Sequence, residues 1–347
     1  MVKWDEFAQE EGEAMALQED YLLAGDVGGT KTNVAIYSRE AGLHAPLLTA
    51  TFPSADYKGL ADLVKEFLER TDVPVKQACF GVAGPVVNGQ ARITNLPWVL
   101  DEAQLAVDLG FSSFTLLNDL VAISSGVPFL KPDDLYTIHH GQAQPGGAIA
   151  IVAPGTGLGE GYLTWDGTHY IAHASEGGHC DFAPTNALEV ELLRYLQAQL
   201  GRVSYERVCS GLGIPNIYAF LRDSGYVEEP AWLAEQLAGA RDPNPVIAQA
   251  ALEREQPCEL CRKTLEIFVS ILGAEAGNMA LRVLATGGVY LGGGIPVHLQ
   301  TMLDSNTFRA AFRNKGRLSH LLAQMPVYVI LHPKIALFGA AAHGFRL

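Results

Sequence analysis

Residues 25–31 read GDVGGTK, and this short glycine-rich stretch decides how the rest of the chain is interpreted. An apolar segment precedes it, and residues 32–37 alternate polar with apolar side chains, as a half-buried strand does. The glycines are therefore expected to form the bend of a hairpin. Glycine lets backbone N–H groups approach an anion closely, and Asp26 offers a carboxylate to a metal ion. This combination suits a magnesium-bound polyphosphate, although an ordinary glycine-rich turn contains the same residue types.

Two better-known phosphate loops do not fit this stretch. The Walker loop requires glycine at the position of Thr30. Both the Walker loop and the dinucleotide fingerprint also lead from a strand into a helix, whereas the pattern after residue 31 predicts a second strand. The stretch is therefore interpreted as a hairpin that holds phosphate.

A second glycine turn between two apolar strands lies near the middle of the chain. Residues 148–153 are apolar, residues 154–159 read PGTGLG, and residues 160–165 continue as another strand. This run fails as a dinucleotide fingerprint because Glu160 takes the place of the last glycine. A repeated strand, turn and strand indicates an internal duplication. The sequence therefore predicts two phosphate-binding hairpins that face each other.

Two polar segments are candidates for ligand binding. Asn118 and Asp119 end an apolar strand at 114–117, at the edge where open α/β sheets bind ligands. The same two residues could instead cap the helix that follows. Glu176 and His179 flank a pair of glycines and could bind a ligand, bind a metal or lie in a solvated loop.

Two further segments lie in the second half of the chain. Ser204 is expected to cap a helix, in which Glu206 is either a ligand or a first-turn acid that favours the helix dipole. Residues 287–296 predict a strand that ends in three glycines, where a base or ribose could lie flat against the backbone. The alternative is a tight turn from strand to helix.

Length and charge limit the class of protein. A chain of 347 residues is long enough for two domains. The net charge of −14 argues against a nucleic-acid partner, because phosphate backbones are bound by clustered Lys and Arg. An anionic ligand must then be held by backbone amides, a metal ion and a few basic side chains.

Cysteine usage and hydropathy indicate a soluble cytoplasmic protein. The five cysteines are expected to be reduced thiols, and Cys258 and Cys261 lack the second pair that a zinc site requires. No run of 18 apolar residues and no basic-then-apolar leader is present, so no membrane partner is expected. Residues 1–20 are strongly acidic and are expected to form a solvated or weakly helical extension.

Six segments together resemble the bacterial-type glucokinase family of the actin-like sugar kinases. In chain order they are residues 25–31, 117–119, 154–159, 176–179, 204–211 and 291–294. The resemblance implies an α/β, actin-like (ribonuclease H-like) fold of two domains with duplicated βββαβα topology and a deep cleft between them. The expected small domain is 21–125 plus 333–347, and the expected large domain is 126–332.

The resemblance also implies roles for individual residues. It assigns the sugar to Asn118, Asp119, Glu176, His179 and Glu206, with Asp119 as the general base. It assigns ATP to Asp26, Gly28, Gly29, Thr30, Lys31, Gly155, Thr156, Gly157, Gly292, Gly293 and Gly294, where Lys31 stands at a variable position of the family. Magnesium is expected to bind Asp26 through water.

The implied reaction is ATP-dependent phosphorylation of D-glucose to glucose 6-phosphate, with in-line transfer to the oxygen that the base deprotonates. Two alternatives stay open: a kinase for mannose, fructose or an amino sugar, and an actin-like nucleotide switch without a sugar substrate. A sugar-responsive repressor is disfavoured because residues 1–20 leave no room for a helix-turn-helix module. The expected partners are a sugar, a nucleotide and a second copy in a homodimer.

Overall fold

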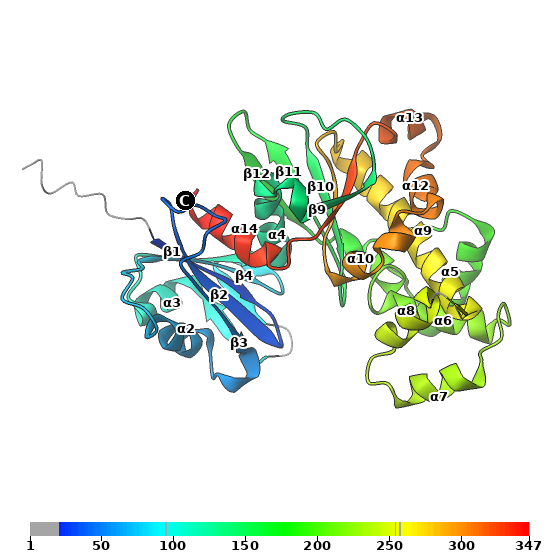
Figure 1. Cartoon of the computed structure of the whole chain (residues 1–347), viewed down its shortest axis with the longest axis horizontal. Coiled ribbons are helices and arrows are strands. Elements are labelled where there is room, and N and C mark those ends of the chain that lie inside the picture. The colour runs from blue at the N-terminus through cyan, green and yellow to red at the C-terminus, as the bar shows by residue number, and fades with distance from the viewer. Residues whose placement is uncertain (1–20, 94–95, 254, 257, 347) are drawn as a thin grey trace, which may run out of the picture. The chain divides into compact units, whose positions relative to one another are not determined.

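The computed structural model describes residues 21–93, 96–253, 255–256 and 258–346 (Figure 1). The acidic extension expected at residues 1–20 lies outside them. The chain divides into two compact units, each described by itself below. Unit 1 contains the chain up to Gly126 and the C-terminal segment from Ala336, and unit 2 contains Val127–Ile335.

Unit 1 is built on a five-stranded sheet with the order β3-β2-β1-β4-β8. Its strands are β1 (Tyr21–Val27), β2 (Lys31–Ser38), β3 (Leu48–Pro53), β4 (Gln77–Val82) and β8 (Ser113–Asn118). The first three strands form an antiparallel meander, and β4 and β8 run parallel to β1. A small separate sheet contains β5 (Val86–Val87), β6 (Gln90–Arg92) and β7 (Val99–Asp101).

Helices cover both faces of this sheet (Figure 1). They are η1 (Ser54–Asp56), α2 (Leu60–Leu68), α3 (Glu102–Leu109), α4 (Asp119–Gly126) and α14 (Ile335–Gly344). On one face, α2 buries four apolar residues at helical spacing against the sheet. On the other face, α14 packs closely on α4, because a Cβ at Gly339 would overlap the carbonyl oxygen of Ala122. The sequence predicts a small-residue helix at 335–345 that returns to the first domain, and α14 packs on the sheet of unit 1.

Unit 2 contains a six-stranded sheet with the order β12-β11-β10-β13-β14-β9. Its strands are β9 (Leu135–His139), β10 (Ile149–Pro154), β11 (Leu158–Trp165), β12 (Tyr170–Ser175), β13 (Gly288–Leu291) and β14 (Val327–Ile330). Apart from β9, their order and directions repeat those of unit 1, with β10 in the place of β1. The duplication predicted from the two glycine turns is confirmed.

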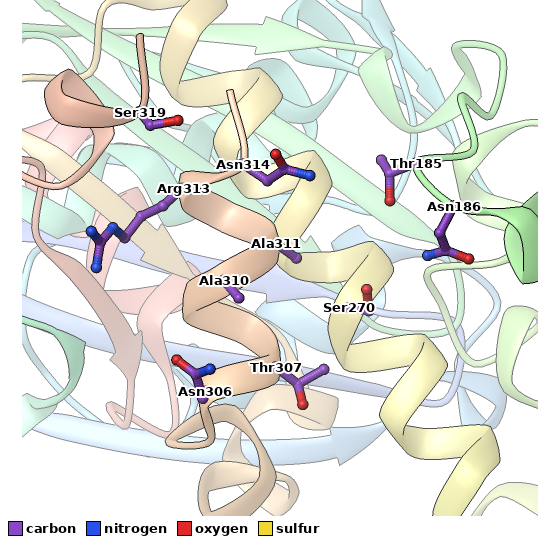
Figure 2. A pocket seen from close by; sticks show the side chains of 10 residues that line it. All are labelled: Thr185, Asn186, Ser270, Asn306, Thr307, Ala310, Ala311, Arg313, Asn314 and Ser319. Atoms are coloured by element: carbon purple, nitrogen blue, oxygen red, sulfur yellow. The ribbon is translucent and has the colours of Figure 1, made fainter. Parts of the chain in front are cut away.

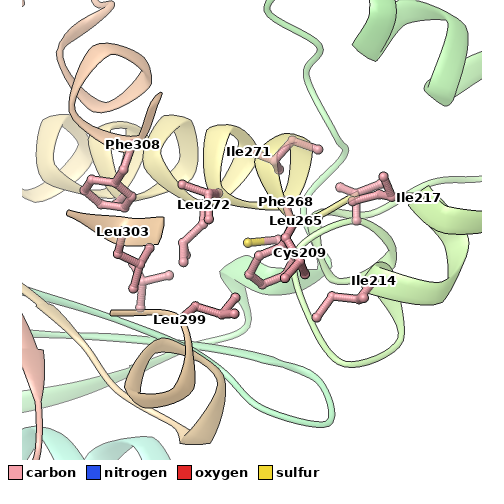
Figure 3. Close-up of a cluster of buried hydrophobic side chains, with 14 of the residues drawn as sticks. Cys209, Ile214, Ile217, Leu265, Phe268, Ile271, Leu272, Leu299, Leu303 and Phe308 are labelled. Atoms are coloured by element: carbon pink, nitrogen blue, oxygen red, sulfur yellow. The ribbon is translucent and has the colours of Figure 1, made fainter. Parts of the chain in front are cut away.

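The helices of unit 2 are η2 (Val127–Phe129), η3 (Pro132–Asp134), η4 (Gly177–His179), α5 (Ala187–Leu200), η5 (Tyr205–Arg207), α6 (Gly213–Asp223), α7 (Ala231–Gly239), α8 (Pro243–Leu252), α9 (Glu259–Val283), α10 (Gly294–His298), α11 (Gln300–Leu303), α12 (Asn306–Arg313), η6 (Gly316–Leu318) and α13 (Ser319–Leu322). Of these, η2 and η3 precede β9, the elements from η4 to α9 lie between β12 and β13, and those from α10 to α13 lie between β13 and β14, with the long helix α9 in the core. Figure 3 shows part of the core, where Leu272 and Phe268 of α9 lie among Leu299, Leu303 and Phe308.

Within the described part of the chain, α9 is the one helix long and apolar enough to cross a membrane, and 72% of its apolar window is buried inside the protein. Its Gly273 and Gly277 face α12 so closely that added Cβ atoms would lie 2.6 and 2.5 Å from the carbonyl oxygens of Phe308 and Phe312. We interpret α9 as the central core helix of unit 2 because α12 lies directly on these glycines.

Two expectations about local structure need correction. Ser204 was expected to cap a helix, but its side chain makes no capping hydrogen bond, and the element that follows is one short 3-10 turn, η5. The sequence predicts a long helix at 265–283 after a helical insertion at 222–262, but the long helix, α9, begins at Glu259, so residues 259–262 belong to it. Leu260 and Cys261 are buried there and extend the apolar face by one turn.

Candidate functional site

The first glycine turn joins β1 to β2 and is held rigidly from one side. The N–H of Gly28 donates to the carbonyl oxygen of Lys31 at 3.0 Å, which closes the turn. The hydroxyl of Ser54, in η1, donates to the carbonyl oxygen of Gly28 at 2.8 Å and lies 3.0 Å from the hydroxyl of Thr32. Thr30 at the tip is exposed. The turn is therefore fixed by backbone contacts while its tip stays open to a ligand.

Asp26 lies at the end of β1, opposite Asn33 of β2. The side-chain amide of Asn33 donates to Asp26 Oδ2 at 3.2 Å. Burial raises the pKa of Asp26, and Asn33 and the charge of Lys31 oppose that shift. A cation near Asp26 would also oppose the rise in its pKa, because it stabilises the charged carboxylate. The described residues contain no group of three or more His, Cys, Asp or Glu suited to a metal, so a metal here would take its other ligands from water and phosphate.

The parallel strands of unit 1 end at one edge of the sheet. Val27, Val82 and Asn118 occupy the same level on β1, β4 and β8. Asn118 therefore lies two strands away from Val27, which is about 9 to 10 Å at the usual strand spacing. The two segments predicted to bind phosphate and sugar in this unit share that edge.

The side chain of Asn118 is engaged with the backbone around it. Its amide nitrogen donates to the carbonyl oxygen of Gly84 at 3.1 Å, and its amide oxygen accepts from the N–H of Leu120 at 2.9 Å. The capping interpretation is therefore confirmed for Asn118. Asp119 is the first residue of α4, where the helix dipole favours a charged carboxylate, and its Oδ1 also accepts from Leu120 at 2.9 Å.

The second glycine turn joins β10 to β11 and rests on the segment that begins with η5. The N–H of Gly155 donates to the carbonyl oxygen of Gly157, and the carbonyl oxygen of Gly155 accepts from Gly211, both at 2.8 Å. The N–H of Leu158 donates to Glu206 Oε2 at 3.1 Å, and a Cβ at Gly157 would overlap that oxygen. Glu206, which the resemblance assigns to the sugar, therefore also supports the predicted phosphate turn.

Glu176 and His179 present exposed side chains on η4 and the residue before it. Their side chains are 73% and 59% exposed, with Glu176 Oε2 and His179 Nε2 4.0 Å apart. The backbone beneath them is tied to the η5 segment, because Arg202 donates to the carbonyl oxygen of His179 at 2.6 Å and Tyr205 donates to that of Cys180 at 2.9 Å. Three of the five predicted sugar ligands are thus carried on two joined segments.

A cavity of about 660 Å³ lies beside the second glycine turn. Gly155 and Thr156 line one part of it, and Gly294 lines another. Gly293 packs tightly on β10, since an added Cβ would lie 2.5 Å from the carbonyl oxygen of Pro154, and its φ of +82° favours glycine. The predicted strand is β13, and the glycines after it turn directly into α10. Two of the three segments predicted to bind ATP are therefore brought to one cavity.

Other walls of this cavity were missed by sequence reasoning. They come mainly from α6, α8 and α10, and they include Ile214, Asn244, Ala248, Leu252, Ile295 and Leu299. The amide nitrogen of Asn244 donates to the carbonyl oxygen of Gly211 at 3.0 Å. No sequence signal marks these residues, because apolar side chains on a helix look the same whether they face a core or a cavity.

Known proteins resemble this chain in sequence and in structure. A family model described as Glucokinase matches residues 23–346. The chain belongs to the glucokinase family. It is 42% identical to a glucokinase of Nostoc punctiforme over 94% of this chain and 99% of that protein, and 36% identical to a glucokinase of Yersinia pestis over 93% and 96%.

Solved structures agree with this family. The structure of a glucokinase from an Antarctic psychrotroph superposes with a TM-score of 0.82 at 31% identity, covering 95% of this chain and all of that one. A ROK family glucokinase from Streptomyces griseus, at 18% identity and a TM-score of 0.60, covers 94% of this chain and shows a likeness of fold. The predicted actin-like fold is confirmed.

A second hollow of about 690 Å³ lies elsewhere in unit 2, between α12, α9 and the start of α5 (Figure 2). None of the predicted family ligands lines it. Some polar groups of its wall already have hydrogen-bond partners. The N–H and the hydroxyl of Thr185 both donate to the buried carboxylate of Glu189, at 2.7 and 2.9 Å. The family's chemistry therefore does not involve this hollow.

Proposed function

We propose that this chain transfers the γ-phosphoryl group of ATP to D-glucose and produces glucose 6-phosphate. One observation carries the proposal: Glu206 binds the second glycine turn while its own segment is tied to the segment of Glu176 and His179. A turn suited to phosphate and a set of side chains suited to hydroxyl groups are thereby joined within hydrogen-bond distance. A sugar kinase requires that combination.

The proposed sugar ligands of unit 2 are Glu176, His179 and Glu206, and those of unit 1 are Asn118 and Asp119. Carboxylates, an amide and an imidazole supply paired donors and acceptors, and a sugar of the wrong stereochemistry leaves some of them unsatisfied. The amide of Asn118 is fixed by two backbone bonds, so it presents a constrained partner to the sugar.

Asp119 is the general base. It accepts the proton of the 6-hydroxyl group as that oxygen attacks the γ-phosphorus in line, a role that contributes about 10²- to 10⁴-fold in rate. Its place at the first position of α4 favours the charged form that a base requires. Exclusion of water is also needed, because the same base would otherwise activate water near ATP.

Each glycine turn is proposed to bind phosphate groups of the nucleotide. Gly155, Thr156 and Gly157 hold phosphate through their backbone, and the adenosine occupies the cavity beside Gly292, Gly293 and Gly294. In unit 1, the proposed phosphate contacts are Gly28, Gly29, Thr30 and Lys31, and Asp26 would orient magnesium through water. Bound magnesium would neutralise charge on the β- and γ-oxygens. The Streptomyces griseus relative was solved with glucose and AMPPNP, which supports a sugar and a nucleotide as the partners.

The purified chain tests this proposal in a coupled assay of ADP release. ADP release is expected to require a hexose and to be fastest, at limiting concentration, with glucose. A higher kcat/KM with mannose, fructose or glucosamine would make the enzyme a kinase for that sugar. ATP turnover that ignores every hexose would support a nucleotide switch and overturn the proposal.

We further propose that the enzyme works in the cytoplasm as a homodimer. All five cysteines lie among the described residues and are free thiols, which suits a reducing compartment. Light scattering after size exclusion tests the dimer, and a mass of one chain across the working concentration range would contradict it.

A further inference from the structure

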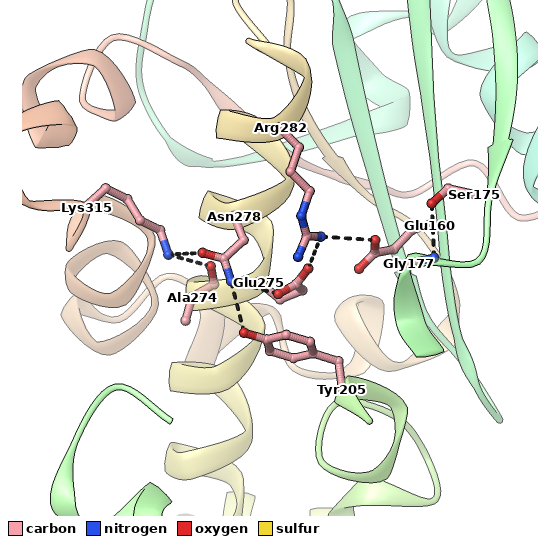
Figure 4. Close-up of polar contacts among 9 residues, drawn as sticks. All are labelled: Glu160, Ser175, Gly177, Tyr205, Ala274, Glu275, Asn278, Arg282 and Lys315. Atoms are coloured by element: carbon pink, nitrogen blue, oxygen red, sulfur yellow. Dashed lines mark hydrogen bonds and ion pairs between the residues drawn. The ribbon is translucent and has the colours of Figure 1, made fainter. Parts of the chain in front are cut away.

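Ionisable side chains are buried beneath the two segments that carry the proposed sugar ligands of unit 2 (Figure 4). Glu160 of β11 and Glu275 of α9 are 1% and 0% exposed. Arg282, on the same helix as Glu275, donates to Glu275 Oε1 at 2.6 Å and lies 3.7 Å from Glu160 Oε2. The guanidinium group of Arg282 is therefore the shared ion-pair partner of two buried carboxyl groups.

The two carboxyl groups are not equally satisfied. Glu275 accepts hydrogen bonds from Arg282 and from the amide of Asn278 at 2.8 Å, and the hydroxyl of Tyr205 lies beside it. Among the residues that the structure describes, neither oxygen of Glu160 has a hydrogen-bond donor. A buried carboxylate without donors is strongly unfavourable, whereas a protonated Glu160 can donate to Glu275. The cluster is therefore complete only when Glu160 holds a proton.

Burial is the main cause of this preference. It raises the pKa of Glu160 to about 8, with the charge of Glu275 acting in the same direction and Arg282 against it. Glu160 thus holds its proton at neutral pH.

Glu160 lies directly against the first sugar segment. A Cβ at Gly177 would overlap Glu160 Oε2, so the backbone between Glu176 and His179 rests on this carboxyl group. Glu160 is also paired with Ser175 across β11 and β12, and the hydroxyl of Ser175 accepts the N–H of Gly177 at 3.0 Å. Any movement of the Glu160 side chain is transmitted to Glu176 and His179.

Glu275 supports the second sugar segment in the same way. Tyr205 directly precedes Glu206, and its hydroxyl is held between Glu275 and the amide of Asn278, the latter at 3.0 Å. The carboxyl pair therefore lies beneath both segments at once.

Charged or titratable groups from several elements surround Glu160 or its partners Glu275 and Arg282. They are Glu275 and Arg282 on α9, Tyr205 on η5, Cys209 after η5, Cys180 after η4 and Lys315 before η6. Burial raises the pKa of Tyr205 and that of Cys209, so neither loses its proton near neutral pH. Burial lowers the pKa of Lys315, whose ammonium group donates to Asn278 at 2.6 Å. Cys180 is exposed and provides a control.

We propose that Glu160 is a positioning residue whose proton, shared with Glu275 beside Arg282, holds both sugar-binding segments in place for glucose. The inference rests on the proposed function, because it names what sets the geometry of that site. Loss of the proton leaves two buried carboxylates beside one guanidinium, and their repulsion displaces Glu160 against Gly177. Glucose affinity then falls.

Calorimetry of glucose binding without nucleotide tests this dependence. Between about pH 7 and about pH 9.5 the Kd of the wild-type enzyme is expected to rise at least about fivefold, because the proton is lost in that window. Glu160→Gln mimics the protonated group, so its Kd should stay within about twofold of the neutral wild-type value across the window. Cys180→Ser should keep the wild-type profile. A wild-type profile in Glu160→Gln, or a flat profile in the wild-type enzyme, overturns the inference.

A second measurement does not depend on the variant folding well. The carboxyl ¹³C resonance of Glu160 in the wild-type enzyme should titrate at the same pH as glucose affinity, and a carboxyl group already ionised at neutral pH overturns the inference. Absence of glucose binding and of phosphorylation at neutral pH would instead overturn the proposed function. The two failures are therefore distinguishable.

Discussion

Asn118 and Asp119 are adjacent in sequence, but their side chains have different structural roles. The amide of Asn118 links the ends of β4 and β8 by bonding Gly84 and Leu120, so its removal would disturb the backbone as well as a ligand contact. Asp119 can be replaced by an isosteric amide at the start of α4 without removing a backbone link between strands. It is therefore the better position for separating chemistry from structure.

Asp119→Asn should bind glucose with a Kd within about threefold of wild type and lose about 10²- to 10⁴-fold in kcat, because only the proton acceptor is removed. Calorimetry measures the first quantity and the coupled assay the second. Asp108→Asn, on the exposed side of α3, is the matched control and should keep full turnover. A wild-type kcat in Asp119→Asn would show that another group accepts the proton.

Asp26 tests the metal assignment separately. Asp26→Ala should leave the Kd for glucose unchanged and weaken use of MgATP by about 10- to 100-fold, the usual effect of losing a group that orients a metal's ligands. Thermal stability should not fall, because the carboxyl group is desolvated at the end of β1. ATP kinetics across a magnesium titration measure the effect. Equal losses of glucose and ATP affinity would instead indicate a collapsed turn.

At the scale of elements, the second hairpin offers two glycines with different surroundings. Gly157 has no space for a side chain because Glu206 Oε2 occupies it, whereas a Cβ at Gly155 would meet nothing within 4 Å. Gly157→Ala should therefore displace Glu206 from the N–H of Leu158 and raise KM for glucose and ATP together, by about tenfold or more, since each tenfold corresponds to about 1.4 kcal/mol of lost interaction. Gly155→Ala should leave KM for glucose unchanged. Steady-state kinetics with both substrates varied decide between them, and an unchanged glucose KM in Gly157→Ala would remove Glu206 from the sugar site.

Elements with a clear period were predictable and those without one were not. Both hairpins and the strand before Asn118 follow from the pattern of polar and apolar residues, and α2 has apolar residues at helical spacing. The short helices α10, α11 and α13 and the edge strand β9 have no comparable period, whereas α12 places Phe308 and Phe312 one turn apart. The walls of the nucleotide cavity were missed for a related reason: α8 reaches it only through packing, and Asn244 shows its partner Gly211 only in three dimensions.

At the scale of the molecule, the duplicated sheets are used differently. Unit 1 has helices on both faces of five strands, whereas unit 2 adds β9 and surrounds α9 with helices. Six motifs in the right order identified the family, but the carboxyl pair was not found. In the sequence, Glu160 was noted because it takes the place of the last glycine of a dinucleotide fingerprint. Glu275 is far from Glu160 in sequence. A buried polar pair of this kind has no sequence signal, because each partner alone resembles a solvated residue.

The same pair predicts how stability depends on pH. The ordinary pKa of a glutamate is 4.5, and burial raises that of Glu160 to about 8 in the folded protein. Between these values the folded state keeps a proton that the unfolded state has released. Stability should therefore fall as pH rises through this window, by at most about 1.4 kcal/mol per pH unit, and become constant above it.

Glu160→Gln removes this contribution because the amide has no proton to lose. Its melting temperature should exceed that of the wild-type enzyme at pH 8 by more than it does at pH 5, measured by calorimetry without ligands. Glu228→Gln, at an exposed position between α6 and α7, is the control and should follow the wild-type curve. Parallel curves for Glu160→Gln and the wild-type enzyme would mean that Glu160 is already charged in the folded state, and that Arg282 alone compensates two buried carboxylates.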